Sequence, residues 1–287
     1  MLILRNPALI AFEAIALAGT VHGAAKAIGL TQTAVTLRLK ALEYELSMTL
    51  FLRSRKGMAL TEEGKALLQL CRGQKELEGQ FLSQVTGDER TDISLTIVGP
   101  TSTISSRIVN ACNHLYAKFP FLNLHYKTED NLNVVDMVRT GVADLAIVHP
   151  SLVPDEMDSK MLKPDKYLLV CSSNWKGRRL ADIISNERII DFYQSDRTTL
   201  NYLKIFNLGE KNIGKRLFAN NNAALIRLFC AEIGFGTLVE SIARPHLESG
   251  ELIALNQSKC MEDKLALIWY PRPAKQSYFE EILKSIK

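Results

Sequence analysis

The sequence predicts an α/β protein whose N-terminal part is an all-α winged helix-turn-helix, followed by a long linker helix and a two-lobed α/β region. Three observations predict this arrangement. Two short helical segments meet at a glycine within residues 20–43, and a heptad-like apolar pattern follows Thr61. From residue 93 onward, strand-like and helix-like segments alternate. The length of 287 residues is enough for two domains.

Composition narrows the class of protein. The chain is 47% hydrophobic with a net charge of +4, and its first 65 residues hold more basic than acidic side chains. The sequence has neither a secretory signal pattern nor an apolar run near 18 residues, so we expect a cytoplasmic protein without a membrane partner. The five cysteines are scattered without a C-x-x-C motif. They predict reduced thiols and no metal site.

The stretch from Thr20 to Glu43 predicts two helices joined by a tight turn. Gly29 supplies the turn, and Thr31 is placed to cap the second helix. The apolar stripe of that second helix consists of Ala34, Val35, Leu39 and Leu42. The side chains that fall largely off this stripe are Gln32, Thr33, Thr36, Arg38 and Lys40. An outer face that is polar and poor in carboxylates suits the major groove of DNA, although a helical hairpin within a core would show the same spacing.

A first helix and a wing flank this hairpin. Pro7 to Ala18 predicts a helix that ends at Gly19. Residues 50–60 predict a two-stranded wing with a basic tip made of Arg53, Ser54, Arg55, Lys56 and Gly57. Such a tip would contact DNA phosphates, and the alternative is a solvated basic loop.

Thr61 predicts the start of a long helix that runs to about Val85, with acidic residues in its first turn. Its apolar seam is formed by Leu67, Leu70, Leu77 and Phe81. A long helix with a narrow seam and no core of its own indicates pairing with a second helix. We therefore predict a dimerising linker, which Gly73 and Gly79 would allow to bend and which breaks at Gly87 to Arg90.

The remaining chain alternates between strands and helices. The predicted strands are Ile93 to Val98, Leu122 to Tyr126, Leu145 to Val148, Tyr167 to Cys171, Arg188 to Ile190, Arg216 to Phe218, Thr237 to Val239, Leu252 to Leu255 and Leu265 to Tyr270. The predicted helices lie between Thr103 and Phe119 and at Leu132 to Arg139, Thr198 to Phe206, Ala223 to Glu232 and Lys275 to Ile286. Units of this kind form parallel or mixed sheets covered by helices, here in two small lobes.

The N-terminal segment and the start of the α/β region both resemble a known protein family. The run AFEAIALAGTVHGAAKAIGLTQTAVTLRLKALEYELSMTLFLRSRKGMALTEEG resembles the winged helix-turn-helix of LysR-type transcriptional regulators. The segments HLYAKFPFLNLHY and VRTGVADLAIV are similar to the first lobe of that family's effector-binding domain, which has a periplasmic-binding-protein fold. The resemblance implies a DNA-binding domain at 1–61, a linker helix at 62–87 and an effector-binding domain at 92–287. Lobe I would comprise 92–164 and 266–287, and lobe II would comprise 165–265.

The resemblance implies a DNA-binding regulator that is not an enzyme and needs no cofactor. Its expected partners are double-stranded promoter DNA, a small-molecule effector and further copies of itself as a homodimer or homotetramer, with RNA polymerase as an additional partner. Base edges would be contacted by Thr31, Gln32, Thr33, Thr36 and Arg38, and the DNA backbone by Arg53, Arg55 and Lys56. Thr33 and Arg38 stand where the family usually has proline and glutamine, and Ser47 where it often has glycine, so no operator sequence carries over.

An effector would sit between the lobes, at the carboxyl ends of the strands. The candidate contacts are Thr101, Ser102, Thr103, Glu129, Asp130, His149, Asp191 and Asn220. The hydroxyls of residues 101–103 and the helix start after them would suit a carboxylate. The later part of the chain resembles the arginine- and lysine-responsive members of the family. Asp191 and Asp196 would then suit a cationic amino acid, and the alternative is that Asp191 caps a turn and Asp196 is solvated.

Two other classes of function fit a two-lobed scaffold. For an enzyme, the chain lacks G-x-S-x-G, H-E-x-x-H and a phosphate-binding loop, and Gly234-Phe235-Gly236 lacks the third glycine of a dinucleotide motif. A solute-binding protein would require export and would not need residues 1–90. Both classes are therefore weaker interpretations than a regulator.

Overall fold

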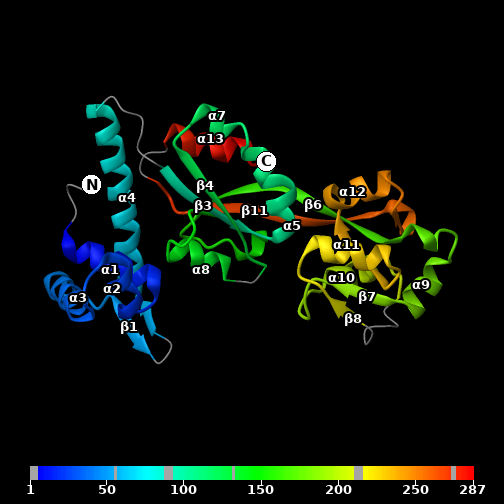
Figure 1. Ribbon diagram of the computed structural model, residues 1–287, viewed down its shortest axis with the longest axis horizontal. Coiled ribbons are helices and arrows are strands. Elements are labelled where there is room, and N and C mark those ends of the chain that lie inside the picture. The colour runs from blue at the N-terminus through cyan, green and yellow to red at the C-terminus, as the bar shows by residue number, and fades with distance from the viewer. Residues whose placement is uncertain (1–5, 55–56, 87–92, 131–132, 210–215, 273–275) are drawn as a thin grey trace.

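The computed structural model describes residues 6–54, 57–86, 93–130, 133–209, 216–272 and 276–287. The N-terminal helices and wing lie at one end, beside the long helix α4, and the two lobes follow toward the other end (Figure 1). The predicted break at Gly87 to Arg90, and Arg55 and Lys56 of the predicted wing tip, lie outside the described residues.

The N-terminal unit is a winged helix-turn-helix. Its elements are α1 (Pro7–Ala18), α2 (Val21–Ile28), α3 (Gln32–Leu46), β1 (Phe51–Ser54) and β2 (Gly57–Leu60). Gly29 adopts a left-handed φ of +67°, and the Thr31 hydroxyl accepts a hydrogen bond from the Ala34 amide at 3.1 Å. Phe12 and Leu39 are fully buried in its core, where the Phe12 and Phe51 rings lie 5.4 Å apart. The predicted turn and cap are confirmed.

The long helix α4 (Glu62–Thr86) confirms the predicted linker helix. The Thr61 hydroxyl caps it by accepting from the Gly64 amide at 3.0 Å. Leu68 and Cys71 are buried against the winged helix-turn-helix. Two members of the predicted seam face outward, with Leu70 67% and Leu77 59% exposed.

Lobe I is built on parallel strands. Its strands are β3 (Ile93–Gly99), β4 (Leu122–Thr128) and β5 (Leu145–Val148), with β3 lying between the other two. Its helices are α5 (Thr101–Thr103), a π-helical turn (Ile104–Ile108), α6 (Val109–Cys112), α7 (Leu115–Lys118), α8 (Val134–Arg139) and α13 (Ser277–Ser285). The predicted helix before Phe119 is thus interrupted by a π turn.

Lobe II continues the same sheet. Its strands are β7 (Arg188–Asp191), β8 (Arg216–Phe218), β9 (Gly234–Val239) and β10 (Leu252–Ala254). Its helices are α9 (Leu180–Asn186), α10 (Thr198–Ile205), α11 (Asn222–Cys230) and α12 (Glu240–Glu248). The sequence pattern did not predict α9 and α12. In α12, Pro245 lies inside the helix, a position where proline normally ends one.

Two long antiparallel strands, β6 (Asp158–Ser172) and β11 (Cys260–Trp269), join the lobes (Figure 1). The sheet order among the described residues is β4-β3-β5-β11-β6-β9-β7-β8, with β10 also pairing with β6. The sequence predicted only the apolar half of each long strand, because the other halves are rich in charged residues. A register shift between Asp263 and Leu265 marks the point where the strands pass from one lobe to the other.

Candidate functional site: a helical reading face and an interlobe cleft

The face of α3 presents the polar side chains that the sequence predicted. Gln32 and Thr33 are exposed, and Thr36 and Arg38 are half-buried. The Thr31 side chain is engaged as the helix cap. His22 of α2, which no pattern in the sequence marked, has its Nδ1 3.1 Å from the Gln32 side-chain amide nitrogen. This contact links Gln32, the first residue of α3, to α2.

The wing is fixed against the turn that precedes α2. The Met58 amide donates to the Gly19 carbonyl at 2.8 Å. Gly57 has a φ of +123°, and a Cβ at this position would lie 2.5 Å from the same carbonyl oxygen. Only glycine therefore fits. Arg53 of β1 is exposed on this wing.

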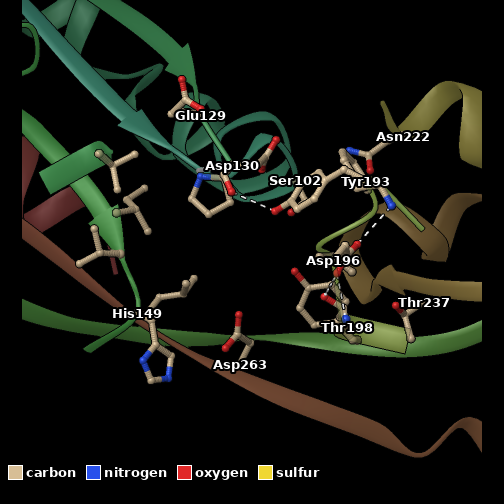
Figure 2. A pocket seen from close by; sticks show the side chains of 18 of the residues that line it. Ser102, Glu129, Asp130, His149, Tyr193, Asp196, Thr198, Asn222, Thr237 and Asp263 are labelled. Carbon is tan, nitrogen blue, oxygen red and sulfur yellow. Dashed lines mark hydrogen bonds between the residues drawn. The ribbon is translucent and has the colours of Figure 1, made fainter. Parts of the chain in front are cut away.

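A cleft of about 240 Å³ lies between the lobes (Figure 2). It opens at the carboxyl ends of β3, β4 and β5, which is where open α/β sheets bind ligands. Four predicted residues line it, namely Ser102, Glu129, Asp130 and His149. Asp196, which the sequence suggested for a cationic effector, also lines it. Polar lining residues that the sequence did not indicate are Tyr167, Tyr193, Thr198, Asn222, Thr237 and Asp263.

Thr101 and Thr103 do not line the cleft. The Asp130 carboxylate accepts from the Thr101 amide at 2.9 Å and from its hydroxyl at 2.7 Å. The first amide of the helical stretch, expected to meet an effector carboxylate, is thus already bonded to a carboxylate of the chain itself. Thr103 is buried and donates to Asp165 at 2.6 Å, away from the cleft.

Tyr193 joins the two lobes across the cleft. Its hydroxyl, from lobe II, donates to the backbone carbonyl of Asp130 in lobe I at 2.9 Å (Figure 2). Burial raises the pKa of Tyr193 to about 12, so the hydroxyl remains a donor at neutral pH. Opening the cleft would therefore break this hydrogen bond between Tyr193 of lobe II and Asp130 of lobe I.

Asp191 and Asn220 also do not line the cleft. Asp191 is 3% exposed and accepts from Arg216 Nε at 2.9 Å and Nη2 at 2.7 Å. Arg216 also donates to the backbone carbonyls of Gln194 and Asp196. The ion pair therefore holds the loop that carries Tyr193 into the cleft. Asn220 is exposed, and Asn222 takes its expected place on the cleft wall.

Asp196 lines the cleft, but its carboxylate is used locally. One oxygen accepts from the Phe192 amide at 3.1 Å, and the other accepts from the Thr198 amide at 2.9 Å and its hydroxyl at 2.6 Å. Hydrogen bonds of this kind shape the loop and the start of α10. Asp196 is thus a turn and capping residue that also presents negative charge to the cleft.

Asp263 differs from the other acidic residues of the wall. It lies at the register shift in β11 and is half-buried, and its carboxylate has no hydrogen bond or ion pair with any residue that the structure describes. Burial raises its pKa, His149 lowers it, and the nearby Asp165 raises it further. Within the described chain, neither lysine nor arginine lines the cleft. The cleft is therefore anionic, and among the residues that the structure describes Asp263 presents a carboxylate with neither a hydrogen bond nor an ion pair.

Two segments of the chain match known families. Residues 7–65 match the family model described as bacterial regulatory helix-turn-helix protein, lysR family, and residues 89–287 match the LysR substrate binding domain. The chain belongs to the LysR family. This confirms the resemblance inferred from the helix-turn-helix.

Among sequence relatives of this LysR-family chain, the HTH-type transcriptional regulator CzcR of Bacillus anthracis is 32% identical over 163 residues, which is 55% of this chain and 54% of CzcR. The chain spans about half the length of the first curated relatives it matches. The HTH-type transcriptional regulator ArgP of Photobacterium profundum is 24% identical over 237 residues, which is 80% of this chain and 78% of ArgP.

Solved structures of two relatives share the fold. One is full-length LysG from Corynebacterium glutamicum with bound effector Arg, at a TM-score of 0.74 and 20% identity, covering 98% of this chain and 96% of that one. The other is ArgP from Mycobacterium tuberculosis, at a TM-score of 0.78 and 20% identity, covering 99% and 96%. The likeness extends over both lobes and the winged helix-turn-helix.

The described residues contain neither a metal-binding cluster nor a membrane-spanning helix. Within them, no group of three or more histidine, cysteine, aspartate or glutamate side chains is arranged to hold a metal ion. Nor does any described helix have the length and apolarity needed to span a bilayer.

Proposed function

We propose that this LysR-family chain is a sequence-specific transcriptional regulator that binds promoter DNA and is switched by a small molecule held between its two lobes. The observation that supports this most is the match of both family models to one chain that holds an exposed polar α3 face and a ligand-sized cleft. A protein with these two sites has the parts needed to link ligand binding to DNA binding.

On the DNA side, α3 would enter the major groove. Gln32, Thr33, Thr36 and Arg38 would meet base edges, and Arg38 is the best candidate reader because a guanidinium bonds guanine O6 and N7 together. Thr31 would orient the helix as its cap. Arg53, together with Arg55 and Lys56, would contact phosphates and position the protein without selecting a sequence.

We infer a dimer formed through α4. Leu70 and Leu77 lie seven residues apart and are largely exposed, which is the spacing of one seam position in a coiled coil. A second copy would cover them, and pairing of dimers would give a tetramer.

In this proposal residues 1–61, 62–87 and 92–287 are the reading, linker and effector-binding units. The protein acts in the cytoplasm without enzymatic activity, and RNA polymerase is its further partner.

The effector we propose is a cationic amino acid. The support comes from the anionic wall of the cleft and from Asp263, whose half-buried carboxylate has no partner among the described residues. A guanidinium or ammonium group would neutralise it and offset its desolvation. The LysG structure, which shares the fold, contains bound effector Arg.

The proposal is tested in two steps with the full chain. A DNA site is first selected from a random pool, and its affinity is measured by fluorescence anisotropy with and without L-arginine, L-lysine and neutral L-citrulline. We expect arginine or lysine, and not citrulline, to change the DNA affinity by at least about fivefold. A chain that selects no DNA sequence would refute the regulator, and an equal response to citrulline would refute the cationic effector.

Asp263 is tested by calorimetry of L-arginine binding. Asp263→Asn should weaken binding by about 10- to 100-fold, since a charge-assisted hydrogen bond contributes about 1.5–3 kcal/mol. Glu262→Gln is the matched control, because it removes the same charge from the neighbouring, exposed position of β11. Equal effects of the two substitutions would show that Asp263 acts only through overall charge.

A further inference from the structure

We propose that helix α8 couples the interlobe cleft to the winged helix-turn-helix, because the long helix α4 is hydrogen-bonded to the C-terminal end of α8. The inference rests on the proposed function of the cleft as an effector site. It identifies a route within one chain by which a ligand would act on DNA binding.

The contact consists of two side chains of α4 and two backbone carbonyls, one of Arg139, the last residue of α8, and one of Gly141, two residues beyond the helix. Gln69 Nε2 donates to the Arg139 carbonyl at 3.2 Å, and the Arg72 guanidinium donates to the Gly141 carbonyl. The carbonyl of Arg139, at the end of the helix, has no partner within it, and this end of a helix favours cationic donors. Gln69 therefore caps the last residue of α8, and Arg72 holds the turn that follows it.

Gly141 makes this approach possible. Its φ is +72°, and a Cβ at this position would overlap the Arg72 guanidinium. The position thus needs glycine both for the backbone and for the contact. Because both demands meet at one residue, substitution of Gly141 gives a direct way to disturb the contact from the lobe I side.

Charged groups support the same junction. Arg139 bonds Asp136 at 3.1 Å and Glu156 at 2.8 Å, which fixes the last turn of α8. The pKa of Glu156 is held below its usual range by its own backbone hydrogen bond, by Arg139 and by the ammonium of Lys65 in α4. The turn that Gln69 and Arg72 contact is therefore held in place within lobe I by its own ion pairs.

The same turn of α4 is anchored in the N-terminal core. Leu68 and Cys71 are buried against the helix-turn-helix, and each precedes by one residue a side chain that bonds lobe I. One turn of helix therefore contacts both units. A displacement of the end of α8 would be passed directly to the reading domain.

The other end of α8 reaches the cleft. Val134, its first residue, lines the cleft, and Val134 and Val138 pack in the buried cluster that includes Val148 of β5. Figure 1 shows α8 on the part of lobe I that faces α4. A six-residue helix spans about 9 Å and moves as a unit in a close-packed core. A ligand that shifts Val134 would therefore shift the carbonyls bound by Gln69 and Arg72.

The first test needs no ligand and uses hydrogen exchange of the full chain. In Arg72→Ala and in Gly141→Ala, amides of residues 135–143 should exchange at least about fivefold faster, because the cap on α8 is lost. Gly177→Ala is the matched control, since Gly177 also has a positive φ, +90°, but has open space at its Cβ. Unchanged exchange in Arg72→Ala would overturn the proposal even if Gly141→Ala failed to fold.

The second test measures coupling. In Arg72→Ala, calorimetry should give an L-arginine affinity within about twofold of the unsubstituted chain, while the arginine-induced change in DNA affinity falls from at least about fivefold to below about twofold. Retention of the full change would overturn the proposal. If arginine and lysine bind neither protein, the proposed effector class fails, and the exchange result alone decides whether α8 is coupled to α4.

Discussion

The Arg216–Asp191 ion pair offers a quantitative test of how lobe II builds its side of the cleft. Arg216→Met removes the charge and keeps similar volume, leaving an Asp191 carboxylate whose side chain is 1% exposed. Removing one partner of a buried ion pair costs about 3–5 kcal/mol because the other charge stays buried and uncompensated. The carbonyls of Gln194 and Asp196 lose a donor as well.

The assay is urea unfolding followed by tryptophan fluorescence. The chain has two tryptophans. In a Trp269→Phe background, Trp175 reports on the lobe II core, in which it is buried. We expect Arg216→Met to lower the free energy of unfolding of this lobe by about 3–5 kcal/mol at pH 7.

The pH dependence identifies the cause. Burial already raises the pKa of Asp191, while hydrogen bonds from Thr199 and Arg216 lower it, so loss of Arg216 raises it further. A carboxyl group whose folded-state pKa is raised contributes stability at low pH and loses it as pH rises through that pKa. The loss of unfolding free energy caused by Arg216→Met should therefore be largest at neutral pH and shrink as pH falls toward the ordinary aspartate pKa of about 3.9.

A double substitution completes the test. Arg216→Met with Asp191→Leu replaces the pair by apolar side chains and should be less damaging than Arg216→Met alone, by at least about 1 kcal/mol. An equal or larger loss in the double variant, with a deficit independent of pH, would refute the reasoning that an uncompensated carboxylate is responsible.

Three further predictions concern the reading face and the cleft. Arg38→Ala should relax base preference at one position of the selected DNA site, and an unchanged preference would exclude Arg38 from base readout. Arg53→Ala should weaken binding to all sequences alike and reduce the slope of log binding constant against log salt concentration by about 0.9. Binding titrations at several salt concentrations distinguish the two effects. Gly57→Ala should abolish specific DNA binding while leaving the arginine affinity unchanged, because the added Cβ displaces the wing from the Gly19 carbonyl; retained binding would show that the wing is dispensable. Tyr193→Phe should change the arginine affinity by about 2- to 10-fold through loss of the bond between lobes, measured by calorimetry, and an unaltered affinity would show that this bond does not contribute.

Local signals in the sequence were sufficient for the helices of the winged helix-turn-helix and for the start of α4. The caps at Thr31 and Thr61 and the turn at Gly29 depend only on neighbouring backbone, so their residue types predicted where helices begin and end. The apolar halves of β6 and β11 were likewise predicted, from their runs of apolar residues. The charged halves of these strands carry little periodic signal, and their strand structure comes from pairing with each other over a long sequence separation.

The cleft shows what the sequence by itself determined and what only the tertiary structure decided. The sequence placed Ser102, Glu129, Asp130 and His149 after strands whose carboxyl ends meet, which was enough to bring them to one wall. It could not determine which acidic side chains are already bonded. Asp191 is held by Arg216, 25 residues away in sequence, and Asp130 bonds Thr101, 29 residues away. Asp263 reaches the cleft because two distant strands pair with a register shift beside it. Partners and register depend on packing between remote segments, and so the structure alone distinguishes an available carboxylate from an occupied one.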